Sequence, residues 1–180
     1  MSDFRFPSRV EKLRQRLAKD ELDAIFISNG ENRRYVSGFV SSAGYLLVTQ
    51  SDAIICTDFR YTELAEQQAP GWRIDRIGGP SDWLAKLVKE FDIKTLGFES
   101  DDMTVSTLER FKKALNENDV IPELKPTSGI GVDLRAYKDD GELELLQRAI
   151  DIGDQAFEET ASQLEVGMTE KDAAWIFEKS

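Results

Sequence analysis

Short apolar runs and amphipathic helical patterns alternate along the first 126 residues. Six segments rich in branched or aromatic residues predict strands: 23–27, 44–49, 53–57, 72–77, 94–99 and, at a sheet edge because it contains a proline, 119–124. Apolar residues at helical spacing predict helices that start near Pro7, Phe59, Ser81 and Asp102. The link between the second and third strands is so short that it forces an antiparallel hairpin. The expected fold class is therefore α/β, a three-layer domain around a mixed sheet.

The pattern changes after Pro126. Residues 127–138 are typical of a connector, and residues 139–180 carry helical periodicity. A long helix is expected to bury a stripe of Leu143, Leu146, Ile150, Gly153 and Phe157. A Thr-x-x-Asp capping box at 169–172 predicts one more helix, which runs to the last residues. We therefore divide the chain into a domain at 1–126, a connector at 127–138, and an interdomain helix with the truncated start of a further domain at 139–180.

Charge is concentrated in the last of these segments. The net charge is −11, and residues 139–180 carry twelve acidic against three basic residues. A net negative chain argues against nucleic acid as the main ligand, because phosphate binding requires a basic surface. Asp151, Asp154 and Glu158 lie along one straight helix, so we interpret them as a solvated face rather than a cation site.

Several functional classes are excluded by what the sequence lacks. The chain has no histidine, which excludes His-assisted triads and most zinc sites. Its single cysteine, Cys56, is expected to be buried in a strand and cannot form an internal disulfide. No apolar run approaches the ~18 residues of a membrane span, and the N-terminus lacks the apolar core of a signal peptide. These features favour a cytoplasmic protein without a membrane partner.

Two polar motifs carry the candidate chemistry, and the first is NRRYVSGF at residues 32–39. Asn32 can cap a short turn, and Gly38 can supply a backbone conformation that other residues avoid. On pattern alone, the favoured interpretation is a loop between strands that Tyr35 and Phe39 hold in the core.

The second motif is TDFRYTELAEQQ at residues 57–68, where a strand ends and a helix starts. Asp58 is expected to accept hydrogen bonds from the backbone N–H groups that follow it. The planar guanidinium of Arg60 suits a carboxylate. Three partners remain open for Arg60: Glu63 in the same helix, an acid on a partner chain, or the carboxylate of a ligand.

Together with the strand GYLLVT between them, these motifs resemble the N-terminal domain of the creatinase/prolidase/aminopeptidase P family. The tail from YKDDGELELLQRAIDIGDQ through GMTEKD resembles the family's interdomain helix and the opening of its pita-bread catalytic domain. The resemblance therefore covers essentially the whole chain, and Xaa-Pro aminopeptidases and Xaa-Pro dipeptidases are the most similar subgroups. It implies a ribonuclease H-like fold without nuclease function.

The resemblance also implies a function. Family members are metallopeptidases that cleave the bond before proline with two divalent ions, often manganese or cobalt, held by two Asp, one His and two Glu in the catalytic domain. Because this chain has no histidine, it is expected to contain no catalytic residue and no metal ligand, and to be inactive by itself. The N-terminal domain would instead support homodimerisation and control the access of peptides with proline in the second position.

The same resemblance implies roles for the two motifs. A loop that includes Arg33, Arg34, Tyr35 and Phe39 is expected to reach a neighbouring catalytic pocket and limit peptide length. A second group is expected to face an inter-subunit or interdomain surface, and it consists of Asp58, Arg60 and Tyr61.

Two other functions remain open from the sequence. A creatinase-like amidinohydrolase would share both domains, and a stand-alone dimerisation or peptide-binding module would lack the enzyme activity altogether. The feature that separates them is whether the five metal ligands follow residue 180.

Overall fold

The structure, a computed structural model, describes residues 5–79 and 81–179. Two compact units make up the chain, residues 1–136 and residues 137–180. The first unit contains one six-stranded sheet in the order β4-β3-β2-β1-β5-β6. Its strands are β1 (Ala24–Ile27), β2 (Tyr45–Thr49), β3 (Ala53–Thr57), β4 (Arg73–Arg76), β5 (Thr95–Glu99) and β6 (Glu123–Thr127).

The sheet is mixed, as predicted. The pairs β1–β2 and β2–β3 are antiparallel, whereas β1–β5, β3–β4 and β5–β6 are parallel. Among the described strands, β2 alone therefore runs against the others. The carboxyl ends of the other five meet at one edge of the sheet, and the loops that follow them are neighbours.

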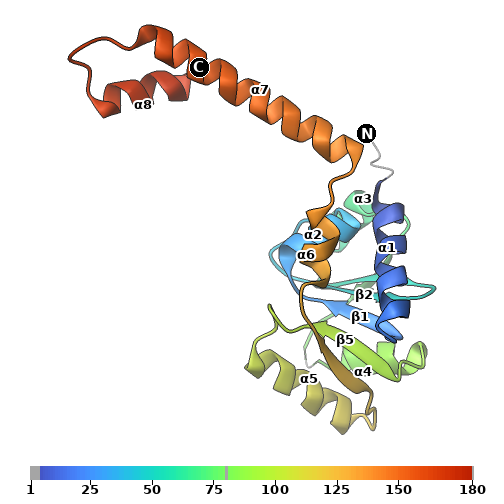
Figure 1. The fold of residues 1–180 in the computed structure, drawn as a ribbon. Helices are drawn as coiled ribbons and strands as arrows, with labels where there is room; N and C mark the ends of the chain where they lie inside the picture. Colours follow the sequence, from blue (N-terminus) through green and yellow to red (C-terminus); the bar gives the residue numbers. More distant parts are fainter. Residues whose placement is uncertain (1–4, 80, 180) are drawn as a thin grey trace. The chain divides into compact units, whose positions relative to one another are not determined.

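Helices cover both faces of this sheet, which gives the expected three layers (Figure 1). One face carries α1 (Arg5–Lys19), α2 (Gly30–Ser37), α3 (Thr62–Gln68) and α6 (Ile130–Ala136). The other face carries α4 (Asp82–Glu90) and α5 (Val105–Glu117). Successive residues of β1 point to opposite faces of the sheet, so both faces need a cover. Ile25 joins the apolar cluster under α1, and Phe26 joins the apolar cluster under α4 and α5. A strand that is buried on both faces has the continuous apolar run seen in the sequence.

An aromatic cluster fills part of the face under α4 and α5. The rings of Tyr45 and Trp83 stack with centroids 5.6 Å apart, and Phe26 and Phe111 meet Tyr45 at 4.8 and 5.7 Å. The face also contains Cys56, which is fully buried as predicted, and this burial raises the pKa of its thiol.

The structure corrects the sequence prediction at the first motif, where α2 replaces the expected loop. Asn29, rather than Asn32, caps this helix, because its side chain accepts hydrogen bonds from the backbone N–H groups of Glu31 and Asn32 at 3.0 Å. Gly38 ends the helix with φ 79°, which is the unusual conformation that the sequence indicated.

The last strand is also displaced from its prediction. β6 begins at Glu123 instead of residue 119, because Asp119 adopts φ 54° and the Val120 N–H still bonds to the Leu115 carbonyl of α5 at 3.0 Å. The strand does lie at a sheet edge. The Glu123 N–H donates to the Lys94 carbonyl, and the Ser100 N–H donates to the Thr127 carbonyl, so Glu123 and Thr127 face β5. Pro126 comes between them in the alternation, and its nitrogen faces away from β5, so the proline removes no hydrogen bond from the sheet.

Two boundaries along the chain differ from the sequence pattern in detail. α3 begins at Thr62, three residues after the predicted start near Phe59. α6 forms within residues 127–138, the predicted connector. The three-part domain division made from the sequence stays a prediction.

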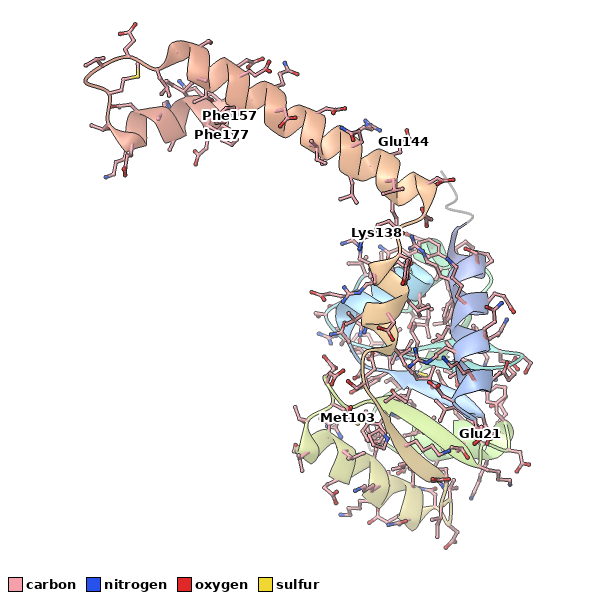
Figure 2. All side chains as sticks on the ribbon, viewed as in Figure 1. Glu21, Met103, Lys138, Glu144, Phe157 and Phe177 are labelled. Carbon is pink, nitrogen blue, oxygen red and sulfur yellow. The ribbon has the colours of Figure 1, made fainter. Side chains whose placement is uncertain are left out.

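The second unit consists of α7 (Asp140–Gln163) and α8 (Glu170–Lys179), which pack on each other. A capping box joins Asp139 and Glu142 at the start of α7, and the predicted capping box at Thr169 and Asp172 is present. The expected burial of the α7 stripe is wrong, because Phe157 is 67% exposed and α8 has only 10 residues with which to cover a helix of 24. Figure 2 labels Phe157 and, on α8, Phe177. The acidic residues of the solvated face are exposed, as predicted: Asp151, Asp154 and Glu158.

None of the helices in the described residues is both long enough and apolar enough to span a bilayer.

Candidate functional site

The two sequence motifs meet at the carboxyl edge of the sheet. Loops that follow β1, β3 and β5, together with the loop that leads into β2, enclose a cleft of about 360 Å³. We call it the carboxyl-edge cleft, and its lining includes Ser28, Arg33, Tyr45, Asp58 and Asp102. Arg33 comes from the first motif and Asp58 from the second, so residues 25 positions apart in the sequence line one cleft.

Arg33 is a buried support for the loop that borders the cleft. It is 4% exposed, and its guanidinium donates hydrogen bonds to the carbonyl oxygens of Ser41 and Gly44, both at 2.6 Å. Burial lowers the pKa of Arg33, because desolvation disfavours the charged form. The side chain therefore fixes the loop at residues 38–44 from inside the unit and has little contact with solvent.

The neighbours of Arg33 in the first motif differ in exposure. Phe39 is fully buried beneath α1. Tyr35 is half-buried, donates its hydroxyl to the Leu134 carbonyl at 3.0 Å, and has the Arg9 guanidinium 4.0 Å above its ring. Arg34 is exposed. Of the four residues predicted from this motif, Arg34 is the one that the unit leaves open to a partner or substrate.

Asp58 and Arg60 form an ion pair at the start of the β3–α3 corner. Arg60 donates from Nε to Asp58 Oδ1 at 3.0 Å and from Nη2 to Oδ2 at 2.7 Å, and its backbone N–H donates to Oδ1 at 2.9 Å. This last bond is the predicted hydrogen bond from a backbone N–H that follows Asp58, but it does not cap α3, whose N-cap is Tyr61. Within this chain, Arg60 therefore pairs with Asp58, two residues away, and not with Glu63.

The pair has a definite pH dependence. The Arg60 side chain holds the pKa of Asp58 below its ordinary value through hydrogen bonds. A carboxyl whose pKa is lowered on folding favours the folded state above its unfolded pKa, and that contribution disappears as pH falls through the lowered value. Both side chains are solvent-accessible, so the pair is suited to exchanging partners at a surface.

Tyr61 connects this corner to the loop at residues 38–44, which Arg33 supports. Its hydroxyl lies 2.6 Å from the Ser42 hydroxyl, and nearby the Val40 N–H donates to the Gln68 side chain at 2.8 Å. Hydrogen bonds therefore join the second motif to the loop that follows the first motif.

Sequence reasoning missed a buried carboxylate that organises this edge. Glu99, 6% exposed at the end of β5, accepts hydrogen bonds from the backbone N–H groups of Ser28 and Asn29 at 2.8 Å each and from the Asn32 amide at 2.5 Å. On its other side, the Asn32 amide packs against Gly131, where an added Cβ would lie 2.0 Å from it. A glutamate that ends an apolar strand was the available signal.

The described residues include no group of three or more His, Cys, Asp or Glu that could hold a metal ion. Two acids at the carboxyl edge are already engaged: Glu99 as above, and Asp102 by the Ser28 hydroxyl at 2.6 Å and the Asn29 amide at 3.2 Å. The part of the chain that the structure describes therefore does not fit a dinuclear metal centre.

The three-layer mixed sheet and the motifs at its carboxyl edge define an α/β domain of the type found at the start of prolidases and creatinases. The Creatinase/Prolidase N-terminal domain family matches residues 9–137, and the chain belongs to this family.

Similar proteins are peptidases. The uncharacterized peptidase YqhT of Bacillus subtilis is 32% identical over 163 residues, which cover 90% of this chain and 45% of that protein. The structure of an Xaa-Pro dipeptidase from Bacillus anthracis is similar over 97% of this chain and 48% of that chain, with 36% identity and a TM-score of 0.84. The N-terminal domain of the cytoplasmic peptidase PepQ from Mycobacterium tuberculosis is 37% identical, with a TM-score of 0.64 over 71% of this chain and 98% of that chain. The chain thus spans about half the length of the longer relatives.

Proposed function

We propose that this chain is the non-catalytic N-terminal part of a dinuclear-metal peptidase that cleaves Xaa-Pro bonds. The observation that carries the proposal is the likeness to an Xaa-Pro dipeptidase, which extends over 97% of this chain but only 48% of that protein. The remaining length of the whole protein would hold two divalent ions, manganese or cobalt, that activate water and polarise the scissile carbonyl. A cytoplasmic location is supported by the similar PepQ domain, which comes from a cytoplasmic peptidase.

In this proposal, the first unit, residues 1–136, supports dimerisation and controls substrate access. The loops at the carboxyl edge of the sheet expose side chains suited to both tasks. Arg34 on α2 is exposed, Val40 is 47% and Phe59 is 68% exposed, and the Arg60 side chain is 56% exposed. Exposed apolar groups beside accessible cations are typical of protein contact surfaces.

The proposal predicts that activity requires the whole natural protein. That protein, stripped of metal and then supplied with manganese or cobalt, should hydrolyse an Xaa-Pro dipeptide and a tripeptide with proline in the second position. Residues 1–180 alone, treated in the same way, should hydrolyse neither. Measurable cleavage by residues 1–180 would contradict the proposal, as would a whole protein that releases urea from creatine and leaves both peptides intact.

Access and dimerisation are expected to depend on different exposed arginines. In the whole protein, Arg34→Ala should change the ratio of kcat/KM between the dipeptide and the tripeptide by about fivefold. Arg60→Ala should instead weaken the dimer by about tenfold in light scattering, because a surface arginine is lost. Lys113→Ala is the control, since its side chain is 74% exposed on α5. Arginine variants that match this control in both assays would refute these roles.

A further inference from the structure

The carboxyl-edge cleft lies where open α/β sheets bind ligands. β1 and β5 are parallel neighbours, and the chain leaves β1 toward β2 on one side but leaves β5 toward β6 on the other. Such opposite departures open a crevice outside the carboxyl ends of the two strands. Ser28 follows β1, and Asp102 and Met103 follow β5; all three line the cleft. Met103 is labelled in Figure 2.

The size and the wall of the cleft suit a small molecule. A second hollow of about 220 Å³ adjoins it and shares Tyr45, Asp58 and Ile77 with it. The combined space falls within the range of about 300–1,000 Å³ that is typical of small-molecule sites. Tyr45 belongs to the stacked aromatic cluster with Trp83, so this wall is apolar and rigid.

The acceptor groups around the cleft already have partners. Arg60 takes both carboxylate oxygens of Asp58. Asp102 receives hydrogen bonds from Ser28 and Asn29. The two acids of the lining are also outnumbered by three arginines, namely Arg33, Arg110 and the Arg60 that pairs with Asp58, so the local charge favours an anion over a cation.

The polar groups that still lack partners are donors. Within residues 5–79 and 81–179, no hydrogen bond is made by the Tyr45 hydroxyl, and no carboxylate pairs with the Arg110 guanidinium, which lies 5.5 Å from the Phe111 ring centroid. Arg33 lines the cleft, is 4% exposed, and has an Nε without a hydrogen-bond partner. α5 also begins beside the cleft, and its first turn contains no acid, so its N-terminal N–H groups favour negative charge.

We propose that the carboxyl-edge cleft and its adjoining hollow bind a small organic carboxylate that carries a flat apolar group. The carboxylate meets Arg110, the Tyr45 hydroxyl and the start of α5, and the apolar group lies against the Tyr45 and Trp83 rings. This site belongs to the N-terminal unit itself, and its existence does not depend on the peptidase proposal.

The test is an NMR titration of the 180-residue chain with benzoate. Benzamide, its neutral analogue, and inorganic phosphate are titrated in parallel. The backbone amides of Ser28, Tyr45 and Thr107 and the indole N–H of Trp83 should shift saturably with benzoate, and benzamide should bind about tenfold more weakly. Equal binding of benzamide, saturation by phosphate alone, or shifts that lie away from the cleft would each overturn the proposal.

Matched variants on one helix sharpen the test. Arg110→Gln should weaken benzoate binding by about fivefold or more, because a charged donor is lost. Lys113→Gln removes an equal charge from the same helix outside the cleft lining and should leave the dissociation constant within about twofold. Both residues are exposed, so both variants should fold, which the dispersion of the same spectra reports. Equal effects of the two substitutions would overturn the assignment of Arg110.

Discussion

Phe39→Ala should lower the free energy of unfolding of the sheet unit by about 3–5 kcal/mol, the usual loss when a buried phenylalanine is truncated. Phe39 is fully buried, in the cluster that α1 forms with the sheet. A cavity opened there cannot collapse easily, because the chain is fixed on both sides of Phe39. Gly38 ends α2 directly before it, and Arg33 holds the Gly44 carbonyl after it. Hydrogen exchange of the β2 and β3 amides in increasing urea measures the loss in this unit separately from α7 and α8.

The control for this variant is a second phenylalanine on the same edge. Phe59 is 68% exposed with the Arg76 guanidinium 5.6 Å from its ring, so Phe59→Ala should cost less than about 1 kcal/mol. If both variants cost the same, or if Phe39→Ala leaves protection of the β2 amides unchanged, the assignment of Phe39 to the core is wrong.

Gly131→Ala should destabilise the same unit by about 2–3 kcal/mol, which is within the range for an overpacked core. The new Cβ would lie 2.0 Å from the Asn32 side chain, and Asn32 cannot retreat without breaking its bond to the buried Glu99. Urea denaturation followed by the same exchange measurement gives the change. The protection of the amides of Ser28 and Asn29, which also bond to Glu99, should fall with it.

Gly153→Ala is the matched glycine for this experiment. Gly153 lies inside α7 with no atom within 4 Å of an added Cβ, so alanine should stabilise its helix by up to about 1 kcal/mol. A Gly131→Ala variant that is as stable as the natural chain would show that α6 can shift. It would contradict the idea that the Asn32–Glu99 hydrogen bond holds Asn32 against Gly131.

The sequence predicts local patterns well and non-local partners poorly. The strands at Ala24–Ile27 and Ala53–Thr57 follow from continuous apolar runs, because both of their faces are buried. α2 was missed because its eight residues include two adjacent arginines and little apolar periodicity, so its helical signal is the Asn29 cap alone.

The candidate site shows the same division between local and distant information. Asp58 and Phe39 behave as their local patterns predict, because Asp58 accepts a hydrogen bond from the backbone that follows it and Phe39 lies in the core. Arg33 does not, because its partners are the carbonyl groups of a loop 8 and 11 residues away, and no side-chain pattern encodes backbone acceptors. The support that Asn32 receives from Glu99, 67 residues away, requires the sheet order to be known.

The position of Pro126 has a consequence for association between chains. β6 forms an edge of the sheet, and the outward-facing groups of this short strand come from Leu124 and Pro126, of which only Leu124 has an N–H to offer. A strand from a neighbouring chain that paired with this edge would meet one backbone N–H donor, whereas an edge without proline would offer two. The β6 edge is therefore a poor template for an added strand, which disfavours edge-to-edge aggregation on that side of the sheet.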